Sequence, residues 1–419
     1  MVRAYPDRVQ AGSGGRSRHP VVRVLATAVA TAGVLSACAG SPGEPTGAPS
    51  PSAPTSASAP AGSVRPTPPA IPLRPGESRV GLGLPDGSYR PKAPHGGSDD
   101  YRCFLLDPHL TSSVFVTGVA FTPGNPAIVH HAILYRATPS QVTAARAKDA
   151  ATGGTGWTCF GDPGLPAGAG DPVASLDDAS WLAGWAPGTG EQLFPSGYGM
   201  PLTAGSMVVL QVHYNLRAGD GSDDSHVLLR LAPGTAHLRA LHTSLLVAPV
   251  ELPCPPGRTG PLCDRGASIL DLISRFGRGA GTTVAGLQLL CGGSLTAPRA
   301  GPTQSCDRRV TRTATILAVA GHMHLLGRSI TVELDPGTSR ARVLFSRPVW
   351  DFDDQRAQVL SDPVTVRPGD DLRVTCTHDA TLRDRLPELR GLPPRYVTWG
   401  AGTTDEMCLG ILLETDGAA

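Results

Sequence analysis

The sequence predicts an all-β protein built from two tandem antiparallel β-sandwich domains of the jelly-roll-like kind. Its 419 residues include 51 Gly and 41 Pro but only 5% aromatic residues, a composition that favours short strands and turns over long helices. From about Val80 onward, short runs rich in Val, Ile, Leu and Thr alternate with Gly, Pro and Asp, as strands and their turns do. The turn at Pro233-Gly234 separates residues 78–233 from residues 234–416, and each part has an ordinary domain size.

Seven apolar segments bounded by turn residues are predicted to be strands: Ser113–Phe121, Ala127–Tyr135, Met207–Tyr214, Val227–Leu231, Ala314–Ala320, Ile330–Leu334 and Leu372–Thr377. Only two stretches are predicted to be helical. One follows Ser140, which would be its N-cap, and the other is Ala267–Phe276, where apolar residues recur at helical spacing.

The N-terminal segment predicts export from the cytoplasm. Arginines precede an apolar run, Val24–Ala37, which is shorter than the roughly 20 residues needed to span a bilayer and fits the core of a signal peptide. The run ends in Leu35-Ser36-Ala37-Cys38, which is similar to a bacterial lipobox. Residues 1–38 are therefore predicted to be a lipoprotein signal peptide, with Cys38 lipidated and tethering the protein to the outer face of the membrane. The alternative is an ordinary signal peptide that ends near a cysteine.

Residues 39–77 consist largely of Pro, Ser, Ala, Gly and Thr. A segment of this composition has too little apolar surface to pack, so it is predicted to be a linker. The net charge of +1 and the pI of about 7.7 give no reason to expect a nucleic-acid partner.

Eight cysteines remain after Cys38, and an even number in an exported protein predicts disulfides. The spacing does not fix the connectivity, but proximity suggests Cys254–Cys263 and Cys291–Cys306. Thiolate ligation of a metal is the alternative, and it is less favoured because the chain has no CxxC pair. Cys408 is expected to pair with Cys376, which would fix the loop that precedes Cys408.

Histidines occur in three strand-like segments, and each is a candidate for metal ligation. His130 and His131 are adjacent, so they could share an ion only if the strand bends or bulges. His213 lies alone in an apolar strand, where a hydrogen-bonded core histidine is the common alternative. His322 and His324 are two residues apart and share one face of a strand, although two solvated edge histidines would fit as well.

Met407 lies in a polar, turn-rich stretch next to Cys408, an unusual setting for a core methionine. Its thioether is a soft ligand that favours Cu(I) over Zn(II) or hard ions. Two imidazoles and a thioether therefore indicate a copper ion that is stable in its reduced state.

Together these segments resemble the type II ascorbate-dependent copper monooxygenases, the family of dopamine β-monooxygenase and the peptide-amidating hydroxylase. The resemblance covers roughly residues 100 to 415. The matching stretches are His130-His131, Trp185-Ala186, Leu210-Gln211-Val212-His213-Tyr214, His322-Met323-His324 with Leu326-Gly327, and Asp405-Glu406-Met407-Cys408.

The resemblance implies two copper ions per chain. His130, His131 and His213, in residues 78–233, would hold the ion that stores and delivers an electron. The catalytic ion, bound by His322, His324 and Met407 in residues 234–416, would bind O₂ and attack a C–H bond of a small substrate. Ascorbate or a similar donor would reduce both ions, which in the family face each other across a solvent-filled cleft. The resemblance also implies a Cys103–Cys159 disulfide.

Three further expectations follow from this comparison. Gln211, two residues before His213, is expected to support the first copper site through hydrogen bonds. Ala320 and Ile411 stand where the peptide-amidating relatives have an arginine and a tyrosine that hold a substrate carboxylate, so a peptide C-terminus is a poor candidate substrate. His378 is interpreted as a structural histidine rather than a seventh ligand.

Two other functions stay open at this point. The chain could be a non-catalytic copper-binding or copper-carrier lipoprotein, although a carrier has no need for two ions with different ligands. A zinc hydrolase is the third interpretation, and a methionine ligand argues against it.

Overall fold

The computed structural model describes residues 71–93, 97–166, 176, 179–217 and 219–417. The predicted signal peptide, the lipidation site at Cys38 and most of the predicted linker lie outside these residues. The first strand, β1 (Ser78–Gly83), begins where the linker was predicted to end. None of the helices in the described ranges is long and apolar enough to cross a membrane.

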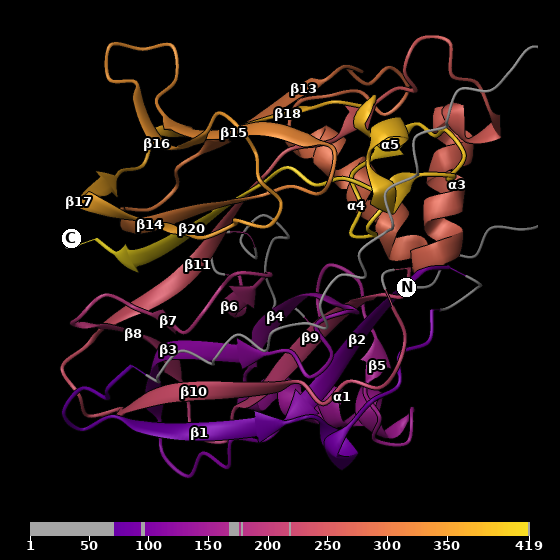
Figure 1. Ribbon diagram of the computed structural model, residues 1–419. Helices are drawn as coiled ribbons and strands as arrows, with labels where there is room; N and C mark the ends of the chain where they lie inside the picture. Colours follow the sequence, from indigo (N-terminus) through magenta and orange to yellow (C-terminus); the bar gives the residue numbers. More distant parts are fainter. Residues whose placement is uncertain (1–70, 94–96, 167–175, 177–178, 218, 418–419) are drawn as a thin grey trace, which may run out of the picture. The chain divides into compact units, whose positions relative to one another are not determined.

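The strands up to residue 233 form two facing layers (Figure 1). One layer is a sheet in the order β5 (Trp157–Thr158), β2 (Asp99–Leu106), β9 (Met207–Asn215), β4 (Val129–Ala137) and β6 (Trp181–Trp185). The other contains β1, β10 (His226–Pro233), β3 (Val114–Thr122) and β8 (Tyr198–Leu202), with β7 (Gln192–Leu193) paired to β3. Phe104, Val119, Leu210 and Leu229 are buried in the core between them.

The strands after residue 233 repeat this arrangement. β11 (Arg239–Val247), β20 (Leu409–Asp416), β14 (Ala314–His322) and β17 (Gln358–Val366) are neighbours in one sheet. The second sheet has the order β13 (Thr303–Arg309), β18 (Asp371–His378), β15 (Gly327–Leu334) and β16 (Arg342–Arg347). The short strands β12 (Glu251–Leu252) and β19 (Val397–Thr398) pair separately. The predicted all-β sandwich fold is confirmed.

One sheet runs through both groups of strands. β8 pairs with β11 in parallel, with Tyr198 opposite Arg239 and Gly199 opposite Ala240. The connection makes a nine-stranded sheet, so strands on the two sides of the predicted boundary are hydrogen-bonded to each other. The division near residue 233 falls at the end of β10 and stays a prediction.

Both predicted helices are present, and both begin earlier in the chain than predicted. α1 (Pro139–Ala150) begins before Ser140, because Pro139 occupies its first turn and Thr138 caps it with Gln141 in a capping box. The second predicted helix is α3 (Arg265–Phe276), capped by Asp264.

A further helix, α4 (Arg278–Leu290), was not predicted. Its glycines and threonines have low helix propensity, and packing of Ala280, Val284 and Leu287 compensates for it. The remaining helical turns are η1 (Pro85–Gly87), η3 (Pro261–Cys263), α5 (Leu382–Arg385) and η4 (Pro387–Leu389).

All four predicted disulfides are formed: Cys103–Cys159, Cys254–Cys263, Cys291–Cys306 and Cys376–Cys408. Cys254–Cys263 lies before α3 and Cys291–Cys306 follows α4, so these two disulfides flank the helical segment. Cys376–Cys408 joins the end of β18 to the residue after Met407, so the loop that carries Met407 is fixed at its C-terminal end.

Candidate metal centre

The three histidines of the first predicted copper site lie together on two neighbouring strands. His131 on β4 is paired with His213 on β9, and the register of these strands shifts between Val129 and His131. This irregularity is the bulge that adjacent histidines need in order to face one ion. The Nδ1 atoms of His130 and His131 are 3.2 Å apart, and those of His131 and His213 are 3.4 Å apart. Ligand atoms of all three lie within 4.8 Å of one another, a separation that a single metal ion can bridge.

A buried carboxylate sets the tautomer of His213. Its Nε2–H donates a hydrogen bond of 2.8 Å to Oδ1 of Asp99, so the lone pair is on Nδ1, which lies 2.9 Å from the Tyr101 hydroxyl and 3.4 Å from Nδ1 of His131. A carboxylate behind a ligand histidine is a common support of metal sites because it fixes the ring and raises its basicity. Tyr101 stacks on the His213 ring, with centroids 4.0 Å apart. Sequence reasoning missed both residues; the only local signal is the Asp99-Asp100-Tyr101 stretch before Cys103.

Burial keeps these imidazoles neutral. It lowers the pKa of His130 and His131 well below the usual range, and the neighbouring histidines lower both further. Burial also lowers the pKa of His213, against the opposing effect of Asp99. A metal ligand must carry a free lone pair, so at neutral pH these three rings are in the form that binds copper.

His322 is the last residue of β14, and His324 lies two residues beyond it, with ring centroids 5.2 Å apart. The prediction that both share one face of a strand is therefore wrong for His324. Each donates from Nδ1, His322 to Oε1 of Gln355 at 2.6 Å and His324 to the carbonyl of Asp405 at 3.1 Å. The Nε2 atom of His324 is buried and has no hydrogen-bond partner among the described residues. A buried nitrogen without a partner is costly unless something binds it, so this atom fits a metal ligand. Burial, together with His324, lowers the pKa of His322 to about 4.

Met407 reaches the same region from the loop before β20. It is almost fully buried and, together with His322, lines a large cavity. Next to it, the carboxylate of Glu406 accepts hydrogen bonds from the backbone N–H groups of His324 at 2.9 Å and Leu326 at 2.6 Å. Glu406 therefore joins the loop of Met407 to the turn that carries His324.

His378 supports this arrangement from β18. Its Nε2 lies 3.4 Å from Glu406 and 3.2 Å from the carbonyl oxygen of Met407. Burial raises the pKa of Glu406, but the hydrogen bond and charge of His378 outweigh it, so the pKa lies below its usual value. Nε2 of His378 is thus held within the loop framework, while its Nδ1 is buried without a hydrogen-bond partner among the described residues. The interpretation of His378 as a structural histidine stays a prediction.

The two groups of ligands are adjacent to each other. The ring centroids of His131 and His322 are 5.9 Å apart, so the two side chains are in direct contact. These two rings are therefore not separated by the solvent-filled cleft that the resemblance implies. Beside them lies a cavity of about 1260 Å³, whose lining includes His131, His322 and Met407.

Hydrogen bonds tie the Met407 loop to the three-histidine site. The hydroxyl and the backbone N–H of Thr403 donate to Asp99 Oδ1, at 2.6 Å and 3.1 Å. The hydroxyl of Tyr101 donates to the carbonyl of Ala401. Burial raises the pKa of Asp99, but the hydrogen bonds from His213 and Thr403 outweigh it and hold the pKa well below its usual range. Asp99 thus supports His213 and holds the loop at once.

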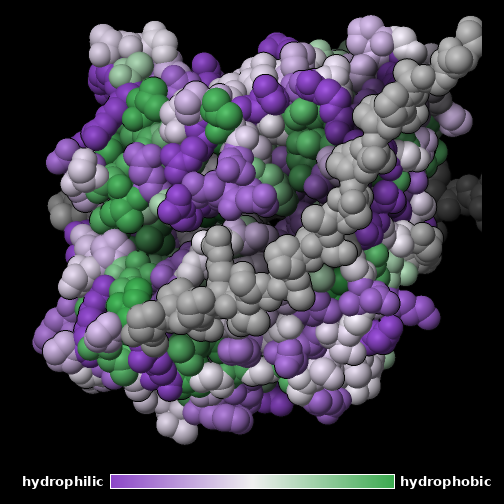
Figure 2. All heavy atoms as spheres, viewed as in Figure 1, coloured by the Kyte–Doolittle hydropathy of each residue, from purple (hydrophilic) through white to green (hydrophobic). Residues whose placement is uncertain are grey.

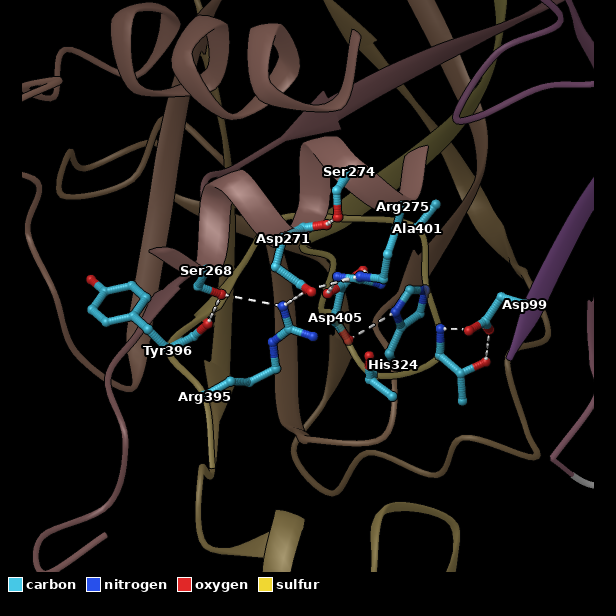
Figure 3. Close-up of polar contacts among 12 residues, drawn as sticks. Asp99, Ser268, Asp271, Ser274, Arg275, His324, Arg395, Tyr396, Ala401 and Asp405 are labelled. Atoms are coloured by element: carbon cyan, nitrogen blue, oxygen red, sulfur yellow. Dashed lines mark hydrogen bonds and ion pairs between the residues drawn. The ribbon is translucent and has the colours of Figure 1, made fainter. Parts of the chain in front are cut away.

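Helix α3 braces the same loop from the other side. Figure 3 shows Asp405 between Arg275 and His324: its carboxylate accepts from both terminal nitrogens of Arg275, at 2.7 and 3.1 Å, while its carbonyl accepts from His324. Asp271 on α3 also pairs with Arg275, at 2.9 Å, and with Arg395. The helical segment therefore positions the backbone oxygen that orients His324.

Gln211 lies on β9 two residues before His213 and is buried. Its Nε2 lies 3.4 Å from Sγ of Cys159, and it contributes to the lining of the cavity. Its supporting role at the first copper site stays a prediction.

Comparison with known proteins supports the family resemblance. Residues 300–413 match the family "Copper type II ascorbate-dependent monooxygenase, C-terminal domain". These residues are thus similar to the C-terminal domain of this family. The match contains His322, His324 and Met407, and the predicted family resemblance is confirmed.

Two curated relatives carry related names. "DBH-like monooxygenase protein 1" of Gallus gallus is 33% identical over 99 residues, which are 23% of this chain and 14% of that protein. "DBH-like monooxygenase protein 2" of Mus musculus is 32% identical over 89 residues, 21% of this chain and 13% of that protein. The chain thus matches about a seventh of the length of these monooxygenases.

Among solved structures, the major capsid protein P2 of bacteriophage PM2 aligns with 80% of this chain and 96% of its own, at 10% identity and a TM-score of 0.27. Similarity at that level supports no conclusion about this chain.

Proposed function

We propose that the chain is an exported copper-dependent monooxygenase that hydroxylates a C–H bond of a small substrate with O₂ and ascorbate or a similar one-electron donor. The observation that supports this proposal is a cluster of three histidines with a second pair of histidines beside it. Three mutually facing ring nitrogens lie beside a second pair of histidines, in which Nε2 of His324 is buried without a partner. A binding protein for one ion has no need of both groups.

Copper, when bound, would supply one-electron transfer and the activation of O₂. The overall reaction is balanced when R–H, O₂, two electrons and two protons give R–OH and water, with two ascorbate molecules each donating one electron. The described residues supply the rest. Asp99, Gln355 and the Asp405 carbonyl fix the tautomers of three ligand histidines, Glu406 fixes the backbone around His324, and the cavity beside His322 provides room for a substrate.

The decisive experiment loads the purified protein with copper and follows ascorbate-dependent oxygen uptake. We expect two copper ions per chain, and in the presence of a substrate one atom of ¹⁸O₂ in the product, measured by mass spectrometry. One ion per chain without ascorbate-linked oxygen uptake would contradict the proposal and favour a non-catalytic copper-binding protein.

Replacing the thioether tests the assignment of the second site. Met407→Leu keeps the side-chain volume but removes the sulfur, so we expect product formation to be abolished while copper stays bound to His130, His131 and His213. Met207→Leu, a buried methionine on β9 packed in the separate cluster with Ala145 and Trp157, is the matched control and should keep full activity. Full activity of the Met407 variant would refute the role of its sulfur.

We propose that the protein acts outside the cytoplasm, attached to the membrane through lipidated Cys38. The four disulfides support an oxidising compartment. Incorporation of labelled fatty acid into the wild type but not into Cys38→Ser would bear out the anchor, and a soluble, unlabelled wild-type protein would contradict it.

A further inference from the structure

The cavity beside His322 has one wall that is apolar along its whole length. On β14, Ala318, Ala320 and His322 follow at two-residue intervals and therefore share a face of the strand. The neighbouring strand β20 places Leu413, Ile411 and Leu409 directly opposite them, in that order. All six residues line the cavity. The ring of His322 thus ends two parallel rows of aliphatic side chains.

The two residues that differ from the peptide-amidating relatives lie in this wall, and they are direct partners. Ala320 is paired with Ile411 across the two strands. These two positions, which hold a substrate carboxylate in the peptide-amidating relatives, thus form one patch in this chain. Both residues of the patch are apolar.

Four charged residues in the described part of the chain also line the cavity. Those in its lining are Arg136, Asp162, Glu191 and Arg356, and none belongs to the two rows beside His322. Arg356 donates two hydrogen bonds of 2.7 Å to Asp354. Glu191 accepts from Arg230 at 3.3 Å and from the backbone N–H of Ile71 at 3.0 Å. These two charges are thus already paired within the protein.

The other lining residues agree with an apolar occupant. Leu193, Phe194 and Met200 line the cavity from the part of the chain before residue 233, and Trp185 and Trp399 are also in the lining. On the face of the molecule shown in Figure 2, apolar side chains gather at the left of the view, above and below the level where the two groups of strands meet. A charged group placed against such a wall would lose its hydration without gaining a partner.

From these contacts we infer that the site takes an uncharged, apolar substrate, whose chain or ring lies along Ala320 and Ile411 with the reacting C–H bond at the His322 end. This inference rests on the proposed monooxygenase function and specifies the class of compound that enters the cavity. Burial of apolar surface supplies the binding free energy, and the wall of aliphatic side chains selects against carboxylates and ammonium groups.

The test compares three probes of one shape and different charge. Propylbenzene, 3-phenylpropanoate and 3-phenylpropylamine are titrated into the copper-loaded protein, and binding is followed by calorimetry and by the fluorescence of the cavity tryptophans. We expect propylbenzene to bind at least about tenfold more tightly than either charged probe. Equal or tighter binding of a charged probe would overturn the inference.

Variants of the wall sharpen the comparison. Ala320→Arg should weaken the binding of propylbenzene and strengthen the binding of 3-phenylpropanoate. Ala320→Leu, which adds volume without charge, should keep the preference for the neutral probe. Ala341→Arg places the same charge at an exposed position before β16 and should bind all three probes like the wild type. If Ala320→Arg does not fold, Ile411→Arg introduces the cation from the neighbouring strand and should produce the same reversal.

The failures of the two proposals can be told apart. Tight binding of propylbenzene without any ¹⁸O-labelled product would uphold the apolar site and count against the monooxygenase. Hydroxylation of a charged probe by a protein that neither binds nor hydroxylates propylbenzene would overturn the apolar site and leave the monooxygenase standing.

Discussion

At the scale of single residues, Asp99 is the main supporting residue of the three-histidine site that the sequence analysis did not identify. It accepts a hydrogen bond from His213 and two from Thr403, and it is buried. Removing its charge while keeping its shape should therefore weaken the three-histidine site, because the carboxylate both orients the His213 ring and raises its basicity.

Asp99→Asn should lower the copper affinity of the three-histidine site by about 10- to 100-fold. The measurement is a competitive titration of Cu(I) against a chromophoric chelator, with the second site removed by Met407→Leu. Asp107→Asn, which changes an aspartate that is only half-buried beyond the end of β2, should leave the affinity unchanged. An Asp99→Asn variant with wild-type affinity would show that the carboxylate has no role in metal binding.

At the scale of elements, the parts predicted from sequence depend on local patterns. His322 ends β14 and His324 follows in the segment after it, so their two-residue spacing brings the rings close without placing both on one strand. The adjacent His130 and His131 need the irregularity that β4 contains. Asp99 and Thr403 are 304 positions apart in the chain, and Gln355 lies 33 residues from His322. No local period encodes such contacts, so only the folded arrangement reveals them.

The helical segment shows a second limit of sequence reasoning. α3 has an Asp cap and a regular apolar spacing, so it could be predicted. α4 carries Gly279, Gly281 and Gly286 and is helical because neighbouring residues bury one of its faces. That the segment supports the Met407 loop through Arg275 depends on a contact between residues 130 positions apart.

Arg275→Leu should destabilise this loop, because the Asp405 carboxylate would stay buried without the cation that neutralises it. We expect the free energy of unfolding to fall by roughly 3 kcal/mol and copper binding at the His322 site to weaken, while the three-histidine site keeps its affinity. Urea denaturation and site-resolved copper titration measure the two effects. Arg278→Leu, at the exposed start of α4, is the control; a similar loss in both variants would mean that the ion pair has no specific role.

At the scale of the whole molecule, hydrogen bonds connect the two groups of predicted ligands. A single sheet passes from the first group of strands to the second through β8 and β11. Asp99 and Tyr101 from the first group hold Thr403 and Ala401 of the loop that carries Met407. A metal ion that orders His213 would therefore also order its partner Asp99 and, through Thr403, the loop of the second site.

This connection predicts that the two copper sites bind cooperatively. Filling the three-histidine site should raise the affinity of the His322, His324 and Met407 site, by a factor in the range of about 5 to 150 that is usual for coupled sites. Thr403→Val removes the hydroxyl that donates to Asp99 and should reduce this factor, whereas Thr404→Val, one residue further along the same loop, should not.

A double-mutant cycle measures the coupling directly. The copper affinity of the second site is compared with and without His213→Ala, first in the wild type and then in the Thr403→Val background. If the loop transmits the effect, His213→Ala weakens the second site in the wild type and weakens it much less once the Thr403 hydroxyl is gone. Equal losses in both backgrounds would mean that the two sites are linked by another route, since the bond between Thr403 and Asp99 would then contribute nothing to their coupling.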